Sequence, residues 1–130
     1  MPIAIDPRSV RRYVLSDERK LIAEGKLTRD AATKFLLKTM SIETECRVAR
    51  ATQEGTHETL PITLREGLVG WENFRDARGI EVPFVVYPAD HPLKGQPTDE
   101  TLERVPRSCR GELMAATMEL SNVSESEREQ

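Results

Sequence analysis

The sequence predicts an α+β fold in which a small antiparallel sheet is packed by three to four helices. Two observations predict the sheet: apolar and polar residues alternate over 33–40, and β-branched and aromatic residues are frequent in 80–87. The helices are predicted by apolar residues that recur three and four positions apart. With 130 residues, 38% of them hydrophobic and 32% charged, the chain fits a single domain with a modest core.

The segment 59–84 is the centre around which we expect the other elements to be arranged. It holds the only Trp, two of the three Phe and three of the seven Gly residues of the chain. A helix is predicted over 59–74 because apolar residues recur along one face, namely Leu60, Leu64, Leu68 and Trp71. Gly67 and Gly70 would each cost this helix about 1 kcal/mol relative to Ala. We therefore expect close packing against the backbone beside Trp71, either by a core strand or by a partner chain in a docking groove.

A hairpin near the N-terminus supplies two of the predicted strands. Residues 12–16 have β character, and the alternation in 33–40 directs Phe35 and Leu37 to the core. The charged residues 17–32 between the strands form an excursion that contains a helical turn or a loop. We expect the two strands to pair in antiparallel fashion.

The third strand is predicted after the central helix. Residues 75–79 include the Asp and Gly that are typical of a turn, and the segment 80–87 follows as a strand. Because Pro83 has no N–H to donate, this segment is limited to the sheet edge or to an extended arm. At the N-terminus, 3–5 predict a further short edge strand and 6–11 a brief helical turn.

A helix is also predicted over 41–53, between the hairpin and the central helix. Ser41 is a suitable N-cap, and Gly55 follows the end of the helix. The buried side of this helix is expected to contain Ile42, Cys46 and either Ala49 or Val48. A short loop would place this helix antiparallel to the central one.

The C-terminal third is expected to be helical after an irregular loop. Three Pro and one Gly in 88–97 exclude regular structure, and Thr98 can cap a short helix. A longer helix is predicted over 106–122. Its buried stripe is expected to contain Cys109, Leu113, Ala116, Thr117 and Leu120. Because 124–130 are polar and acidic, we expect a flexible acidic tail after a single domain at 1–123.

The distribution of charged and apolar residues argues against some classes of partner. Residues 1–40 carry nine Lys and Arg against five Asp and Glu, whereas 41–130 carry ten against seventeen. This asymmetry favours self-association or an electropositive partner site. The basic residues are scattered and lack neighbouring aromatic residues, so no nucleic-acid interface is predicted. No apolar run approaches the roughly 20 residues that span a bilayer, so no membrane partner is predicted.

No set of residues has the spacing of a catalytic, cofactor or metal site. His57 and His91 fall in polar loops, and no phosphate-binding loop or nucleophile motif is present. Cys46 and Cys109 lack metal-ligand spacing and fit buried helix positions in a reducing cytoplasm. We therefore expect a protein that is not an enzyme and that carries no cofactor.

Residues 67–84 carry a pattern that resembles a known class of proteins. They match G-L-x-G-W-x-N-F-x-D-x-x-G-x-x-V-P-F, and 119–125 match the start of E-L-S-x-L-(T/S)-x-E-E with Val123 where Leu is usual. Both patterns resemble the small morphogenesis proteins of tailed bacteriophages, many of which are tail assembly chaperones. The segment 19–30 has no counterpart in that class.

The resemblance implies a non-enzymatic protein that holds the tape-measure or tail-tube protein during tail assembly. Such a protein acts in the cytoplasm of the bacterial host. The expected partner-binding residues are Leu64, Leu68, Trp71, Phe74 and Phe84. Two alternatives stay open: a structural component of the virion at the head–tail connection or tail, and a small regulator that binds a host protein complex.

Overall fold

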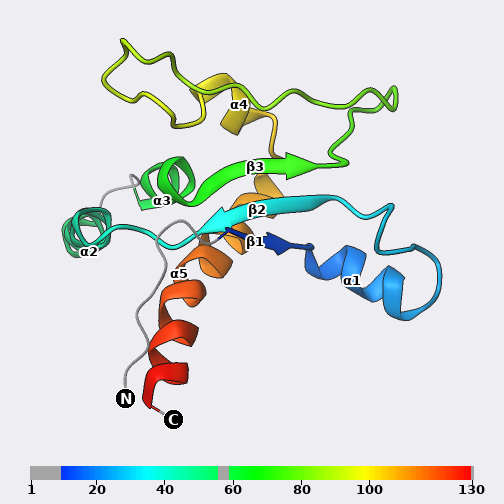
Figure 1. Cartoon of the computed structure of the whole chain (residues 1–130), viewed down its shortest axis with the longest axis horizontal. Helices are drawn as coiled ribbons and strands as arrows, with labels where there is room; N and C mark the ends of the chain where they lie inside the picture. Colours follow the sequence, from blue (N-terminus) through cyan, green and yellow to red (C-terminus); the bar gives the residue numbers. More distant parts are fainter. Residues whose placement is uncertain (1–9, 56–58, 130) are drawn as a thin grey trace.

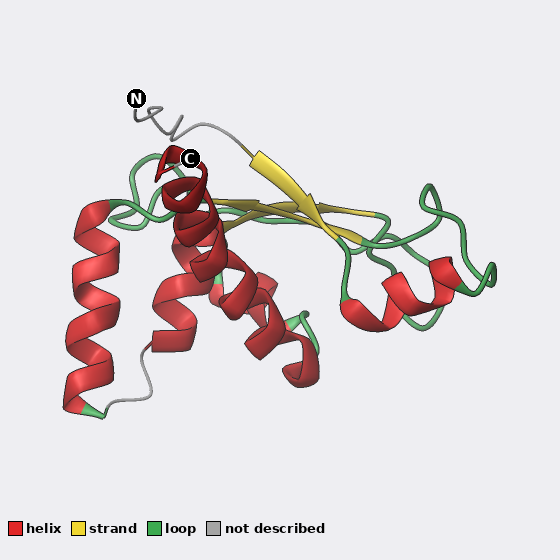
Figure 2. Cartoon of the chain, turned by 90° about the horizontal axis from the view of Figure 1, so that it is seen from below, coloured by secondary structure: helices red, strands yellow, loops and turns green. Residues whose placement is uncertain are grey.

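The computed structural model describes residues 10–55 and 59–129, with the side chains of 59–61 and 121–129 excepted. The described chain is α+β, as predicted, with a three-stranded antiparallel sheet and five helices (Figure 1). Figure 2 shows most of the helical turns on one side of the sheet. The edge strand predicted over 3–5 lies outside the described residues. The helical turn predicted over 6–11 is wrong at Val10 and Arg11, which belong to the first strand, and the rest of it lies outside the described residues.

The N-terminal hairpin of the prediction is confirmed. Strand β1 (Val10–Tyr13) pairs antiparallel with β2 (Lys34–Lys38), so that Tyr13 lies opposite Phe35. Phe35 and Leu37 are both buried. The excursion between the strands contains a short helix, α1 (Ser16–Ala23).

The prediction of a third strand near 80–87 is wrong. The third strand is β3 (Leu68–Glu72), which pairs with β2 and comes from the second half of the predicted central helix. Only the first half is helical, as α3 (Thr59–Gly67). The two elements follow one another directly in the chain.

A β-bulge explains why this strand resembles a helix in sequence. Leu36 pairs with Gly70 while the next residue, Leu37, pairs with Leu68, so that Val69 is the extra residue. In a regular strand, residues three positions apart point to opposite faces, whereas the bulge brings Leu68 and Trp71 to the same side. Both are buried. Leu68 and Trp71 are thus three positions apart and buried on the same side. Residues on one face of a helix have this spacing too.

The close packing expected at Gly67 and Gly70 is present. A Cβ atom at Gly67 would overlap the side chain of Thr117, and one at Gly70 would lie 3.1 Å from Cδ1 of Leu36. The packing elements are thus the C-terminal helix and strand β2. Neither glycine lies in the interior of a helix, because Gly67 is the last residue of α3 and Gly70 belongs to β3.

Residues 80–87 form an extended arm, which is the other outcome that Pro83 allows. The arm carries only isolated bridges, between Arg75 and Glu81 and between Val86 and Pro97. The turn before it is confirmed: Oδ1 of Asp76 accepts hydrogen bonds from the N–H groups of Arg78 and Ile80. Gly79 in that turn has a φ of 78°.

Helix α2 (Ile42–Glu54) has the predicted ends, but of the residues predicted to be buried only Val48 is. The Ser41 hydroxyl accepts from the N–H of Thr44, and Gly55 closes the helix with a φ of 69°. The residues that face α3 are Thr44, Val48 and Ala51, whereas Ile42, Cys46 and Ala49 are exposed. Small or apolar residues line both sides of α2, so the sequence pattern did not identify the packed side.

The C-terminal helices follow the prediction closely. Helix α4 (Asp99–Glu103) is capped by Thr98, whose hydroxyl accepts from the N–H of Thr101. The buried stripe of α5 (Arg107–Glu129) contains Leu113, Ala116 and Thr117, with Cys109 and Leu120 packed against the core.

The stop predicted near Asn122 is wrong, because the backbone of α5 continues to Glu129. Residues 123–129 contain neither Gly nor Pro, so nothing in them breaks a helix. Flexibility of the acidic segment 124–130 stays a prediction, since its side chains and residue 130 lie outside the description.

Candidate partner-binding surface

The residues predicted to bind a partner come together, but in the core. Leu64 is 2% exposed, Leu68 0% and Trp71 8%. Phe74 and Phe84 are half-buried, and their rings lie 4.8 and 4.9 Å from the Trp71 ring. The aromatic cluster therefore forms a packed core, which agrees with the first of the two interpretations drawn from the glycines. A direct role in partner binding stays a prediction.

Trp71 holds the arm against the sheet. Its Nε1–H donates a 2.7 Å hydrogen bond to the carbonyl oxygen of Val82, and the ring of Phe84 packs against it edge-on. The N–H of Val82 donates in turn to the carbonyl of Phe74, at 2.8 Å. Side chain and backbone together fix where the arm leaves the core.

The polar residues of the same sequence pattern shape the turn between β3 and the arm. Asn73 has a φ of 57°, a conformation that Asn tolerates better than most residues, and its Nδ2 donates to the carbonyl of Asp30. The Thr33 hydroxyl donates to the carbonyl of Asn73 at 2.9 Å. Asn73 is thus tied to the last residues of the β1–β2 excursion, immediately before β2, so the pattern 67–84 has a direct structural explanation.

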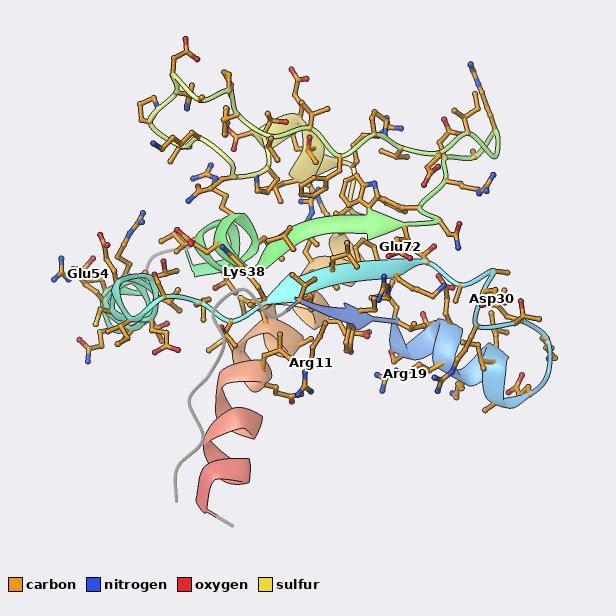
Figure 3. All side chains as sticks on the ribbon, viewed as in Figure 1. Arg11, Arg19, Asp30, Lys38, Glu54 and Glu72 are labelled. Atoms are coloured by element: carbon orange, nitrogen blue, oxygen red, sulfur yellow. The ribbon has the colours of Figure 1, made fainter. Side chains whose placement is uncertain are left out.

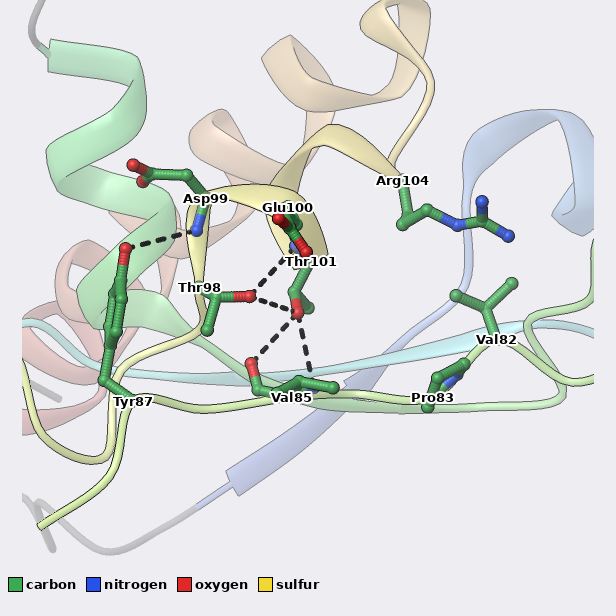
Figure 4. Close-up of a pocket in the computed structure, with 9 residues that line it drawn as sticks. All are labelled: Val82, Pro83, Val85, Tyr87, Thr98, Asp99, Glu100, Thr101 and Arg104. Atoms are coloured by element: carbon green, nitrogen blue, oxygen red, sulfur yellow. Dashed lines mark hydrogen bonds between the residues drawn. The ribbon is translucent and has the colours of Figure 1, made fainter.

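A groove of about 710 Å³ lies between the arm and α4 (Figure 4). It is lined by Val82, Pro83, Val85, Tyr87, Thr98, Asp99, Glu100, Thr101 and Arg104. The Thr101 hydroxyl donates to the carbonyl of Val85 at 3.0 Å and accepts from its N–H at 3.3 Å. This pair of bonds joins the arm to α4 and sets the width of the groove.

The chemistry of the groove differs between its two ends. Apolar side chains of the arm form one wall, and the guanidinium of Arg104 extends toward the Val82 end (Figure 4). Within the described part of the chain, that guanidinium has no hydrogen-bond or carboxylate partner. At the other end, Asp99 is already paired with Arg65 at 2.7 Å, and its N–H donates to the Tyr87 hydroxyl. An apolar segment with a carboxylate near Arg104 fits this arrangement.

The arm exposes apolar side chains both in the groove and outside it. Ile80 is 60% exposed, Val85 49% and Val86 43%. These three residues, which we call the arm patch, lie within seven positions of one another. Sequence reasoning missed them because it placed 80–87 in the sheet. The available signal was Pro83, which makes regular strand pairing unfavourable and leaves an extended chain.

A polar cluster around Glu112 joins α1 to α5. Its carboxylate accepts 2.8 Å hydrogen bonds from the Tyr13 hydroxyl, the Ser16 hydroxyl and the Ser16 N–H. Because Ser16 begins α1, the carboxylate from α5 serves as the N-terminal cap of that helix. Arg19 also donates to the Tyr13 hydroxyl.

The ionisation of both acidic groups is shifted by this contact. Burial alone raises the pKa of Glu112, but the hydrogen bonds from Tyr13 and Ser16 outweigh burial and lower the pKa from 4.5. Burial raises the pKa of Tyr13 from 10.0, and the bonded, charged Glu112 raises it further. Both shifts favour the bonded pair of carboxylate and phenol, so this cluster has a structural role.

The other candidate groups of the sequence do not converge. His91 stacks on Tyr87 at 4.2 Å and its Nδ1 accepts from the N–H of Leu93, while His57 lies outside the described residues. In the described segments, no three His, Cys, Asp or Glu side chains lie close enough to hold a metal ion. Figure 3 shows the labelled charged side chains spread over the molecule, from Glu54 at the end of α2 to Asp30 beyond α1.

Comparison with known proteins adds no relative. Nothing matches this chain among protein-family models, curated proteins or solved structures. As for membranes, none of the helices in 10–55 and 59–129 has the length and apolar character to cross one.

Proposed function

We propose that this chain is a non-enzymatic phage protein of tail and virion morphogenesis, acting as an assembly chaperone for the tape-measure or tail-tube protein. The observation that carries the proposal is the pattern of residues 67–84, which resembles phage morphogenesis proteins at every defined position. In this role the protein holds a client segment until the client polymerises. It makes and breaks no covalent bond.

The groove between the arm and α4 is the proposed client site. Its apolar wall, formed by side chains of the arm, suits the apolar face of an unassembled client. Arg104 supplies a fixed positive charge for a client carboxylate. The buried residues of the pattern, above all Trp71, act indirectly because they position the arm.

The test is co-expression with the tape-measure and tail-tube proteins of the same phage. The chaperone proposal predicts that one of these proteins becomes soluble and co-purifies with the chain. A groove variant that combines Val85→Glu with Arg104→Glu should lose this effect, because it places acidic groups against an apolar, acidic client segment. Loss of solubilisation by about ten-fold or more is expected for removal of a central contact.

The arm provides a matched control for that variant. Val86 is 43% exposed beside Val85 but does not line the groove. Val86→Glu should therefore leave client solubilisation within about two-fold of the original protein, as is usual for residues outside a binding centre. Equal losses in both variants would contradict the groove as the site. Failure of the unaltered chain to bind either client would overturn the proposed function.

A further inference from the structure

Helix α2 lies at the end of the helical layer. It packs against α3, which packs against α5, and the two views agree that its outer side faces away from the molecule (Figures 1 and 2). None of the described residues covers the outer side of α2, so a further helix can continue the layer there.

The open side of α2 carries an apolar stripe of its own. Ile42, Cys46 and Ala49 are exposed at i, i+4 and i+7, which is one face of a helix. At 100° per residue this stripe is half a turn away from the buried stripe, whose central residue is Val48. Ile42 is 80% exposed, the largest fraction among the exposed large hydrophobic residues of the described chain.

The charges beside the stripe are complementary to those of a second copy of the same helix. Glu43 and Arg50 are seven residues apart, so they lie two turns apart on the same flank of the stripe. Both are exposed, and neither has an ion-pair partner among the side chains that the structure describes. A two-fold axis perpendicular to the plane of an antiparallel helix pair exchanges the two helices. It leaves the same flank of each helix on the same side of the pair, while the two chains run in opposite directions. Such an axis places Glu43 of each copy beside Arg50 of the other.

We propose that the stripe of Ile42, Cys46 and Ala49 on α2 docks against the same stripe of a second copy of this chain. The two helices run antiparallel about a two-fold axis, with two reciprocal pairs of Glu43 and Arg50 across the contact. Each copy extends the helical layer of the other. This contact is separate from the client groove, and it does not depend on the proposed function.

The size of the contact sets the strength of the dimer. With 13 residues, α2 is about 20 Å long. A single pair of such helices buries less than the roughly 800 Å² per partner of a standard interface. The dimer is therefore weak and reversible, and it forms at high protein concentration.

The first experiment is sedimentation velocity of the full chain over a concentration series that reaches the millimolar range. The proposal predicts a monomer–dimer equilibrium that Ile42→Arg weakens by about ten-fold or more, as expected for loss of a central apolar contact. Ile80→Arg is the matched control, because it makes the same change at an exposed residue of the arm. Ile80→Arg should leave the dimer constant within about two-fold.

The second experiment tests the antiparallel register. Glu43→Arg and Arg50→Glu should each weaken the dimer, because each faces like charges across the axis. Both changes in one chain should restore it. An equimolar mixture of the two single variants should also restore it, as a heterodimer in which every facing pair is opposite in charge. Circular dichroism of each variant confirms that the helix content is unchanged.

Three results would overturn the proposal. A chain that stays monomeric over the whole series has no such contact. A dimer that Ile42→Arg and Ile80→Arg affect equally uses another surface. A dimer that the mixture of single variants does not restore has a different register from the one proposed.

Discussion

Gly67→Ala tests the close approach of the Gly67 backbone to Thr117. The added Cβ would overlap Cγ2 of Thr117 and lie 3.0 Å from its Oγ1. Thr117 is fully buried and its hydroxyl donates to the carbonyl of Leu113 at 2.9 Å, so the side chain has no free space into which to turn. Either the Thr117 side chain or the backbone around Gly67 must shift.

The magnitude follows from two opposing effects. Overpacking of a core costs about 1–3 kcal/mol. Replacing Gly by Ala in a helix returns at most about 1 kcal/mol, and less at the last helical residue. We expect Gly67→Ala to lower the free energy of unfolding by about 1–2 kcal/mol.

The assay is urea denaturation followed by the fluorescence of Trp71, the only Trp in the chain and 8% exposed in the fold. Gly111→Ala is the control, because a Cβ at Gly111 meets nothing within 4 Å inside α5. That control should stabilise the protein by up to about 1 kcal/mol.

A second-site change then isolates the contact. Thr117→Ser removes Cγ2 but keeps the hydroxyl, so the double variant with Gly67→Ala should be more stable than the sum of the single effects by about 1 kcal/mol. A Gly67→Ala protein as stable as the original, or strict additivity in the double variant, would refute the close packing of α3 on α5.

Four further predictions concern the arm, the turn and the Glu112 cluster. Trp71→Phe removes the bond to the carbonyl of Val82 and should destabilise the protein by about 1–3 kcal/mol in thermal unfolding; an unchanged melting temperature would contradict the role of this bond. Asp76→Ala removes two hydrogen bonds from an exposed turn and should cost about 1 kcal/mol in urea denaturation, and no loss would show that the turn forms without it. The lowered pKa of Glu112 gives stability that is present above 4.5 and is lost as the pH falls through the pKa in the folded state, so Glu112→Gln should flatten the acid side of the stability profile. The raised pKa of Tyr13 gives stability that is present below 10.0 and is lost as the pH rises through the folded-state pKa, so Tyr13→Phe should flatten the alkaline side.

Local chemistry made much of the fold predictable from sequence. The caps at Ser41 and Thr98 and the turn at Asp76 depend on neighbouring residues alone, and all three are present. The alternation that buries Phe35 and Leu37 is equally local in origin. The α+β class follows from these elements.

The errors arose where tertiary contacts decide between equal local patterns. The bulge at Val69 gave β3 the spacing of a helix, and only pairing with β2 reveals the strand. The two stripes of α2 are both suitable for burial, and only the position of α3 selects the one with Val48. The candidate groove was missed for the same reason, since α4 and the arm meet only in the folded chain. The bond between Thr101 and Val85, 16 residues apart, is what brings them together.

Under the proposed function, this chain is a phage protein that assists assembly and is absent from the finished particle. The most direct test is mass spectrometry that quantifies the chain in lysate of cells infected by the phage that encodes it and in purified particles of that phage. The chaperone proposal predicts abundance in the lysate and no more than trace amounts in the particle. High copy number in the particle would contradict the chaperone role and would favour a structural component of the tail or of the head–tail connection.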